Sequence, residues 1–181
     1  MAWSSSRRPT RGSRHTGGSP RRRRGFVPAT VRPLVPADLE RVVAIERAAF
    51  SDPWPRSAFV ELLAQAHVRA VAALGPDGRL AGYALATVVA DQGEILNLAV
   101  EPDVRRRGLG RELLASLLAM FRREAVATVH LEVRQSNATA LGLYARFGFR
   151  QVSTRRAYYR NPTENAVTMA LGLTPEVAEK G

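Results

Sequence analysis

The sequence predicts one α/β domain built on a mixed sheet. Strand and helix signals alternate along the chain from about Val31, and no internal repeat is present. Leucine recurs every fourth residue from Leu109 to Leu117, which is the spacing of a helix with one apolar face. The turn residues of Gly75–Gly78 separate two apolar runs, as in a β-hairpin. With 181 residues, the chain is long enough to bury a substantial core.

The first half of the chain is expected to supply two helices and four strands. A β-branched run predicts a strand at 31–35. Helical spacing then continues through Leu39, Val42, Val43, Glu46, Ala49 and Phe50. Two prolines within 51–55 interrupt this helix, and a second helix is expected at 57–66. Apolar runs predict strands at 68–74, 80–90 and 94–100, the second returning antiparallel to the first.

The second half is expected to supply two helices and three strands. The leucine-rich helix continues to Phe121, with polar side chains on its other face. Residues 128–133 alternate, which places one set of side chains on each face of a strand: Val129, Leu131 and Val133 against His130, Glu132 and Arg134. Ser136 or Asn137 can cap a helix that runs to Phe147, and Gly148 ends it. Strands at 149–155 and 166–171 complete the sheet.

The net charge of +11 comes mostly from the N-terminal segment. Residues 1–26 hold eight arginines and no acid, which leaves 19 basic and 16 acidic residues in 27–181. We expect 1–28 to be a disordered tail because it has little to bury, 29–173 to be the folded domain, and 174–181 to be a short polar tail. The arginine tail is consistent with weak contact to RNA or a ribosome, with a targeting segment, or with a dispensable extension.

Composition also excludes several classes of protein. The chain has no cysteine, which rules out disulfides, thiolate metal sites and a cysteine nucleophile. Its three histidines share no metal-ligand spacing, so we expect no metal. No apolar run approaches the roughly 18 residues of a membrane span. We therefore expect a cytoplasmic protein without membrane contact.

The string Arg105-Arg106-Arg107-Gly108-Leu109-Gly110 lies between a predicted strand and a predicted helix. The start of a helix presents unpaired N–H groups and a positive dipole end, which bind phosphate oxygens. The string is not a Walker A loop, and Leu113 stands where a dinucleotide fingerprint needs its third glycine. It is either a phosphate-binding turn of another kind or an ordinary helix start with exposed arginines.

Two further residues are candidates for proton transfer. Glu132 lies on the polar face of its strand, where a carboxylate can act as a general base. The alternative is a surface glutamate paired with Arg134. Tyr144 lies on the helix after Asn137, and its phenol can donate a proton to a developing thiolate. The alternative is a core tyrosine with its hydroxyl at the surface.

These candidates fall in one order along the chain, and that order resembles the GNAT acetyltransferase family. The strings Asn97–Asp103, Arg106–Arg111, Leu131–Asn137, Ala140–Tyr144, Phe147–Phe149, Arg155–Tyr159 and Phe50–Trp54 further resemble the bacterial ribosomal-protein alanine N-acetyltransferases. The resemblance covers roughly residues 30–172 and does not extend to the arginine tail. It implies the GNAT fold, in which a mixed, mostly antiparallel central sheet is flanked by helices.

The resemblance also implies acetyl-CoA as co-substrate and assigns residues to hold it. The strand backbone at 98–100 would bind the pantetheine arm, the amides of 105–110 the pyrophosphate, and Asn137 the region near the thiol. The full set is Leu98, Ala99, Val100, Arg105, Arg106, Arg107, Gly108, Leu109, Gly110 and Asn137.

For catalysis, the resemblance implies direct transfer in a ternary complex. Glu132 would take a proton from the attacking ammonium through water, and this deprotonation is modest work near neutral pH because an N-terminal amine has a pKa near 8. A strand N–H from 98–100 would stabilise the oxyanion, and Tyr144 would protonate the departing thiolate. Glu94, which precedes the same strand, is the alternative base. The absence of cysteine fits a route without an acyl-enzyme.

The acceptor is the least determined part. Tyr158 and Tyr159 are expected on the loop between the last two strands, where they would frame a peptide N-terminus together with Trp54. The leading acceptor is the N-terminal alanine of a small-subunit ribosomal protein. The alternatives are another N-terminus, a lysine side chain or a small amine, or a non-enzymatic acetyl-CoA-binding module that its arginine tail tethers to RNA.

Overall fold

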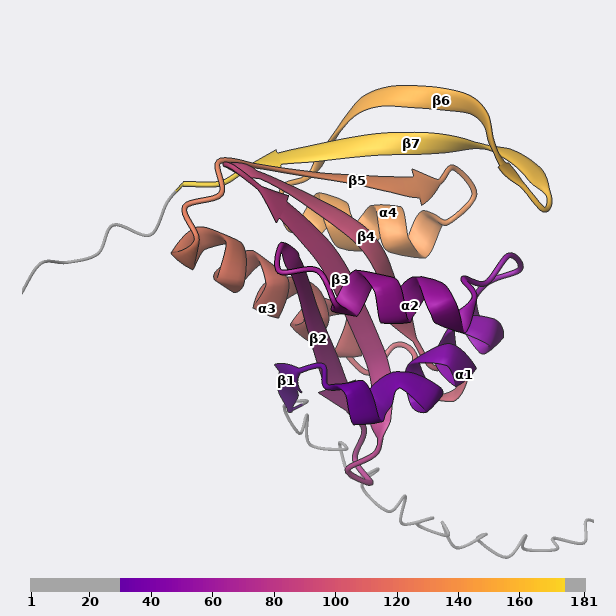
Figure 1. Cartoon of the computed structure of the whole chain (residues 1–181). Helices are drawn as coiled ribbons and strands as arrows, with labels where there is room; N and C mark the ends of the chain where they lie inside the picture. The colour runs from indigo at the N-terminus through magenta and orange to yellow at the C-terminus, as the bar shows by residue number, and fades with distance from the viewer. Residues whose placement is uncertain (1–29, 175–181) are drawn as a thin grey trace, which may run out of the picture.

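The computed structural model describes residues 30–174, in which one seven-stranded sheet carries helices on both faces (Figure 1). The strand order across the sheet is β1-β2-β3-β4-β5-β7-β6. The strands are β1 (Val31–Pro33), β2 (Val68–Leu74), β3 (Leu80–Val89), β4 (Gln92–Val100), β5 (Thr128–Arg134), β6 (Arg150–Arg160) and β7 (Thr163–Gly172). The helices are α1 (Leu39–Ala49), α2 (Arg56–Leu63), α3 (Leu109–Arg123) and α4 (Ala138–Arg146).

The sheet is mixed and mostly antiparallel, as predicted. Every pair of neighbouring strands is antiparallel except β4 and β5, which are parallel because α3 connects them as a crossover. The last strand, β7, lies between β5 and β6. The three strands that follow α3 therefore form an antiparallel unit that joins the rest of the sheet through β5 alone.

Helices α3 and α4 cover one face of the sheet, and α1 and α2 cover the other (Figure 1). The predicted apolar face of α3 is fully buried, and it packs against apolar side chains of the strands that include Val129, Leu131 and Val133. Burial of this much apolar surface is the main favourable term in folding the domain. On the opposite face, Val42, Phe59 and other apolar side chains of α1 and α2 form a second core over β3.

The alternation predicted for β5 is confirmed. Its three apolar side chains are buried under α3, whereas His130, Glu132 and Arg134 are only partly buried. Since side chains alternate along a strand, these polar residues point to the face on which α1 and α2 lie. The functional candidates of β5 thus lie on the side of the sheet opposite α3.

The last two strands are longer than predicted. Strand β6 continues to Arg160 and β7 begins at Thr163, so Tyr158 and Tyr159 lie within β6 rather than on a loop. The extension carries no apolar alternation because almost every residue of β6 is exposed. Backbone hydrogen bonds to β7 hold the extension in place. Such bonds do not depend on the side chains, so the sequence pattern could not predict this part of the strand. Smaller differences are the earlier end of α2 at Leu63 and the earlier start of β4 at Gln92.

The predicted N-terminal tail at 1–28 and most of the predicted C-terminal tail at 174–181 lie outside the described residues. Within residues 30–174, no helix is long and apolar enough to cross a membrane. No group of three or more histidine, aspartate or glutamate side chains in this range is arranged to hold a metal ion.

Candidate active site

The predicted phosphate-binding turn connects β4 to α3 and leaves a row of N–H groups without partners. Gly108 precedes the first residue of α3 with a φ of 89°, a conformation that favours glycine. The first helical hydrogen bond runs from the N–H of Glu112 to the carbonyl of Gly108, at 3.1 Å. Within the described residues, the N–H groups of 106–111 donate to no protein acceptor. Such a row at a helix N-terminus is suited to an anion such as a pyrophosphate.

Strand β4 separates from its neighbour β5 halfway along its length. The two strands pair from Gln92 to Ile95, and no pairing continues beyond that point. Leu85 of β3 pairs with Asn97 while Ala86 pairs with Ile95, so Leu96 is the extra residue of a β-bulge. From there to Val100, the edge of β4 that faces β5 has backbone groups available to a ligand. The residues predicted to hold the pantetheine arm, Leu98, Ala99 and Val100, all lie in this part of the strand.

Glu132 lies on β5 beyond the point of separation, and its ion-pair partner differs from the sequence-based alternative. Its carboxylate contacts the guanidinium of Arg155 at 2.8 Å, across the sheet on β6. Arg134 pairs instead with Glu164, at 3.3 Å. A hydrogen bond with Glu132 raises the pKa of Tyr158, which lies near Arg155 on the same strand. Glu132 therefore forms its ion pair with a residue of β6 and not with Arg134 of its own strand.

Tyr144 reaches the same neighbourhood from the opposite face of the sheet. It is buried on α4, and its ring contacts that of Phe149 edge to face at 5.7 Å between centroids. Burial, followed by the nearby phenol of Tyr159, raises the pKa of Tyr144 to about 12. Burial, followed by the charge of Glu132, raises the pKa of Tyr159 to about 12 as well. Tyr159 thus interacts electrostatically with both Glu132 and Tyr144.

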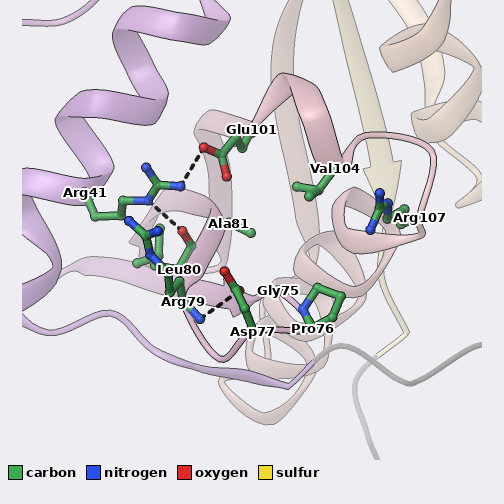
Figure 2. A pocket seen from close by; sticks show the side chains of 10 residues that line it. All are labelled: Arg41, Gly75, Pro76, Asp77, Arg79, Leu80, Ala81, Glu101, Val104 and Arg107. Carbon is green, nitrogen blue, oxygen red and sulfur yellow. Dashed lines mark hydrogen bonds and ion pairs between the residues drawn. The ribbon is translucent and has the colours of Figure 1, made fainter.

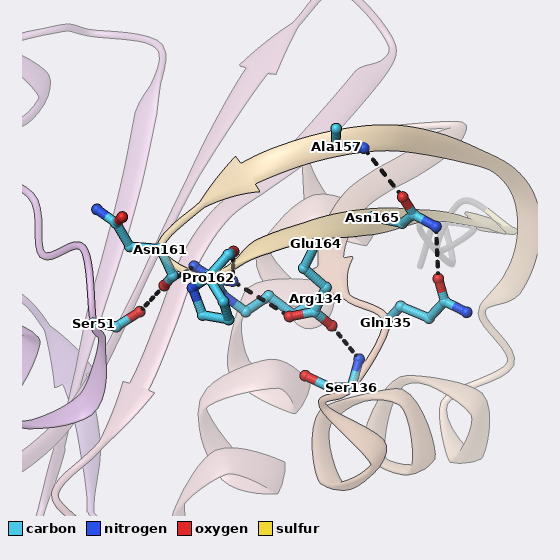
Figure 3. Close-up of polar contacts among 9 residues, drawn as sticks. All are labelled: Ser51, Arg134, Gln135, Ser136, Ala157, Asn161, Pro162, Glu164 and Asn165. Carbon is cyan, nitrogen blue, oxygen red and sulfur yellow. Dashed lines mark hydrogen bonds and ion pairs between the residues drawn. The ribbon is translucent and has the colours of Figure 1, made fainter.

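A bulge in β6 brings its tyrosines to the site. Arg155 pairs with Ala166 and Tyr159 pairs with Glu164, so three residues of β6 stand opposite Asn165 alone. The Asn165 side chain accepts from the N–H of Ala157 at 3.1 Å and donates to Gln135 at 3.0 Å (Figure 3). These bonds fix the bulge against the loop between β5 and α4. The bulge turns Tyr159 so that the guanidinium of Arg134 lies 4.2 Å from its ring centroid.

The β6–β7 hairpin also contacts the two loops that surround the site. Glu164 accepts a hydrogen bond from the N–H of Ser136, directly before α4 (Figure 3). At the tip of the hairpin, the hydroxyl of Ser51 donates to the carbonyl of Asn161 at 2.6 Å. Ser51 belongs to the loop between α1 and α2. The α1–α2 loop and the hairpin therefore meet above the face to which Glu132 points.

Of the two capping candidates that the sequence offers, Ser136 and Asn137, it is Asn137 that caps α4. Its side-chain oxygen accepts from the N–H of Ala140 at 3.1 Å and thereby caps α4. It directly follows Ser136, whose N–H donates to Glu164 of β7. The amide nitrogen of Asn137 forms no hydrogen bond within the described residues, so it is available to a ligand.

Two arginines of the turn, Arg105 and Arg107, have other contacts in the structure. Arg105 donates to the carbonyl of Val100 at 3.1 Å and so closes the end of β4. Arg107 lines a separate hollow with Arg41 and Arg79, where Arg41 pairs with Glu101 at 2.6 Å (Figure 2). This hollow contains neither predicted catalytic residue. The backbone N–H groups of the turn can hold an anion without the side chains of Arg105 and Arg107.

Sequence reasoning gave no role to Glu46, which is buried at the base of the α1–α2 loop. Its carboxylate accepts from the N–H of Trp54 at 2.9 Å, from the side chain of Asn97, and from the hydroxyl of Tyr83. The sequence signal that could have identified this residue is its spacing, because Glu46 follows Val42 and Val43 by four and three residues and so lies on the same apolar face of the helix. A carboxylate on that face is expected to be buried and therefore to need hydrogen-bond donors.

The fold, the turn with unpartnered N–H groups before α3 and the separated parallel strands together define an acetyltransferase of the GNAT type. The GNAT acetyltransferase family matches residues 39–149, and the chain belongs to this family. The resemblance inferred from the sequence motifs is therefore confirmed.

Individual relatives within the family are similar over most of their length. The ribosomal protein bS18-alanine N-acetyltransferase of Escherichia coli K12 is 38% identical over 149 residues, which are 80% of this chain and 98% of the relative. The N-alpha-acetyltransferase RimI of Mycobacterium tuberculosis H37Rv is 40% identical over 148 residues, or 78% of this chain and 91% of the relative. The crystal structure of the E. coli ribosomal-protein-S18-alanine N-acetyltransferase superposes with a TM-score of 0.76 at 35% identity, covering 83% of this chain and 97% of that one.

Proposed function

We propose that this chain transfers the acetyl group of acetyl-CoA to the N-terminal α-amine of a ribosomal protein, with alanine as the first residue. The observation that carries the proposal is the position of Glu132 on β5, one residue beyond the last pair that β5 forms with β4. The acceptor class is supported by the relatives named above, whose substrate is ribosomal protein bS18 or a protein N-terminus.

Acetyl-CoA fits the residues on the α3 side of the sheet. The unpartnered N–H groups of 106–111 match the charge of its pyrophosphate, and the free edge of β4 from Leu98 to Val100 matches the amides of its pantetheine arm. The amide nitrogen of Asn137 offers one more donor. The co-substrate supplies an activated acetyl group as a thioester.

The acceptor amine approaches from the other face, toward which Glu132 points. Glu132 accepts a proton from the ammonium group, through a water molecule, so that the nitrogen lone pair becomes free. The amine nitrogen then bonds to the acetyl carbonyl carbon while the bond from that carbon to sulfur breaks. A backbone N–H of the 98–100 segment stabilises the negative oxygen that forms in between.

The departing thiolate takes its proton from Tyr144, and the second proton that the amine nitrogen loses as the amide forms restores the phenol. Because burial raises the pKa of Tyr144 to about 12, the phenol is fully protonated at neutral pH and available as a donor. Glu132 is only partly buried, and its carboxylate contacts the exposed guanidinium of Arg155 at 2.8 Å.

The proposal is tested by mass spectrometry of peptides incubated with the purified protein and acetyl-CoA. The panel contains alanine-, serine- and methionine-first peptides, with free or blocked N-termini and with or without lysine. Acetyl gain on free alanine-first peptides alone is the expected result. Gain on blocked, lysine-containing peptides would assign the acceptor to side chains. No gain on any peptide, with acetyl-CoA binding intact, would point to a small amine or to a binding module.

A further inference from the structure

Glu46 is the most deeply buried charged side chain among the described residues, at 1% exposure. None of the arginine, lysine or histidine side chains described in the structure forms an ion pair with it. A buried carboxylate without a cation is costly unless several donors compensate it. An apolar residue would fill this position of α1 without that cost, since its helical neighbours Val42 and Val43 pack into the same core. The carboxylate therefore calls for a reason other than stability.

The three donors of Glu46 come from three different segments. The N–H of Trp54 belongs to the α1–α2 loop, and it donates at 2.9 Å. The amide nitrogen of Asn97 belongs to β4, and it lies 3.3 and 3.2 Å from the two carboxylate oxygens. The hydroxyl of Tyr83 belongs to β3, and burial raises the pKa of this phenol, so that it remains a donor.

The first two of these segments are the two sides of the candidate site. The α1–α2 loop carries Ser51, which meets the tip of the β6–β7 hairpin on the acceptor side. Asn97 directly follows the bulge residue Leu96. It directly precedes Leu98, the first of the β4 residues that are proposed to bind the pantetheine arm of acetyl-CoA. Within the described residues, Glu46 is the side chain that hydrogen-bonds to both the loop and this part of the strand.

The Asn97 side chain is held from one direction only. A carboxylate accepts and cannot donate, so the Asn97 amide must turn its nitrogen toward Glu46. The Asn97 side-chain oxygen is buried and has no hydrogen-bond partner in the described structure. The orientation of this amide therefore depends on Glu46 and on no other polar group.

We propose that Glu46 is a positioning residue for acetyl transfer, which aligns the acceptor loop at Trp54 with the donor strand at Asn97. This inference rests on the proposed function. Glu46 moves no proton and touches neither substrate in this role. It sets the distance between the α1–α2 loop, beside which the amine binds, and strand β4, beside which the thioester binds. The rate of transfer between two bound groups is sensitive to small changes in their relative position.

The test compares three variants that each change one part of the network. Glu46→Gln keeps the shape but leaves one accepting oxygen for the three donors, so that the tie between loop and strand is weakened. Asn97→Leu removes only the arm to β4 and decides the question if Glu46→Gln does not fold. Tyr83→Phe is the matched control, because it removes a hydrogen bond of the same buried carboxylate but leaves the loop and β4 tied to it.

Each variant is measured for kcat and KM on the acceptor, for the Kd of acetyl-CoA, for thermal unfolding, and for hydrogen exchange of the 50–55 segment. For Glu46→Gln and Asn97→Leu we expect kcat/KM for the acceptor to fall by about tenfold to a hundredfold, with the acetyl-CoA Kd changed by about twofold or less. Glu46→Gln should also speed exchange of the Trp54 amide. Tyr83→Phe should lower the unfolding temperature without either effect.

Three results would overturn the inference. They are parental kinetics in Glu46→Gln or Asn97→Leu, unchanged exchange at Trp54 in Glu46→Gln, and a loss of activity in Tyr83→Phe as large as in the other two. If the parent protein acetylates a different amine from the one proposed, the proposed acceptor fails while the same comparison on that amine still decides the role of Glu46.

Discussion

Replacing Glu132 with glutamine removes the proposed base while keeping the size and shape of the side chain. This change should have little effect on the free energy of unfolding. The ion pair with Arg155 spans 2.8 Å, but the Arg155 side chain is 60% exposed, and exposed pairs contribute up to about 1 kcal/mol. We therefore expect Glu132→Gln to remain folded, with a free energy of unfolding within about 1 kcal/mol of the parent.

The effect on turnover should be much larger. A positioned general base contributes typically about 10²- to 10⁴-fold to a rate. This range corresponds to about 3–5 kcal/mol in the activation barrier. The difference between parent and variant should narrow above about pH 8, because an N-terminal amine then loses its proton to solvent without help. Loss of activity, retained stability and partial recovery at high pH together form the expected signature.

The assay is steady-state release of free CoA with an alanine-first peptide, followed from pH 6 to pH 10. The control is Glu94→Gln, since Glu94 is exposed on β4 and pairs across the sheet with His130. We expect this control to change kcat by no more than about threefold, as for a surface substitution. A larger loss for Glu94→Gln than for Glu132→Gln would refute the assignment of the base.

Three further predictions concern the acid, the turn and the start of α1. Tyr144→Phe should lower kcat by about 10²-fold with little change in the acetyl-CoA Kd, and the parent should show no alkaline decline of kcat from this phenol below about pH 11, since its pKa is raised to about 12. Gly108→Ala, at a φ of 89°, should lose about 1–2 kcal/mol in thermal unfolding and weaken acetyl-CoA binding in calorimetry. Asp38→Asn should destabilise by about 1–2 kcal/mol at pH 7 in urea unfolding, because it breaks two bonds from the Arg32 guanidinium, whose side chain is 35% exposed. Since Arg32 holds the pKa of Asp38 below its ordinary 3.8, this difference should be complete above about pH 4 and shrink as the pH falls through the lower folded value; a difference that does not shrink with falling pH would contradict it.

Elements with a strong apolar period could be predicted from the sequence. The leucine positions of α3 and the alternation of β5 both identify the buried side correctly. The reason is that side chains packed between α3 and the sheet have to be apolar, and this requirement produces both patterns. The cap at Asn137 and the turn at Gly108 could also be predicted, since each depends on a local backbone requirement. In all of these cases the determining interaction lies within a few residues or on one face of one element.

The rest depends on pairings between distant segments. The extension of β6 through Tyr159 follows from its backbone bonds to β7, and those bonds leave no trace in an exposed, arginine-rich stretch. The partner of Glu132 proved to be Arg155 on β6 rather than Arg134 on its own strand, because the bulge opposite Asn165 sets which side chains meet. Glu46 could be assigned to α1 from its spacing, but its donors lie on β3, β4 and a loop.

Because β7 lies between β5 and β6, the half of the sheet that carries Glu132 cannot assemble in the order in which it is synthesised. Strand β6 leaves the ribosome before β7 and has no partner until β7 has followed it. Contacts that join distant parts of a chain form late and slowly in folding. The arginines of β6, spread along an exposed strand, disfavour pairing with other chains during this interval. A chain that stops before Thr163 would contain the turn and α3 but would lack the strand that closes the acceptor side.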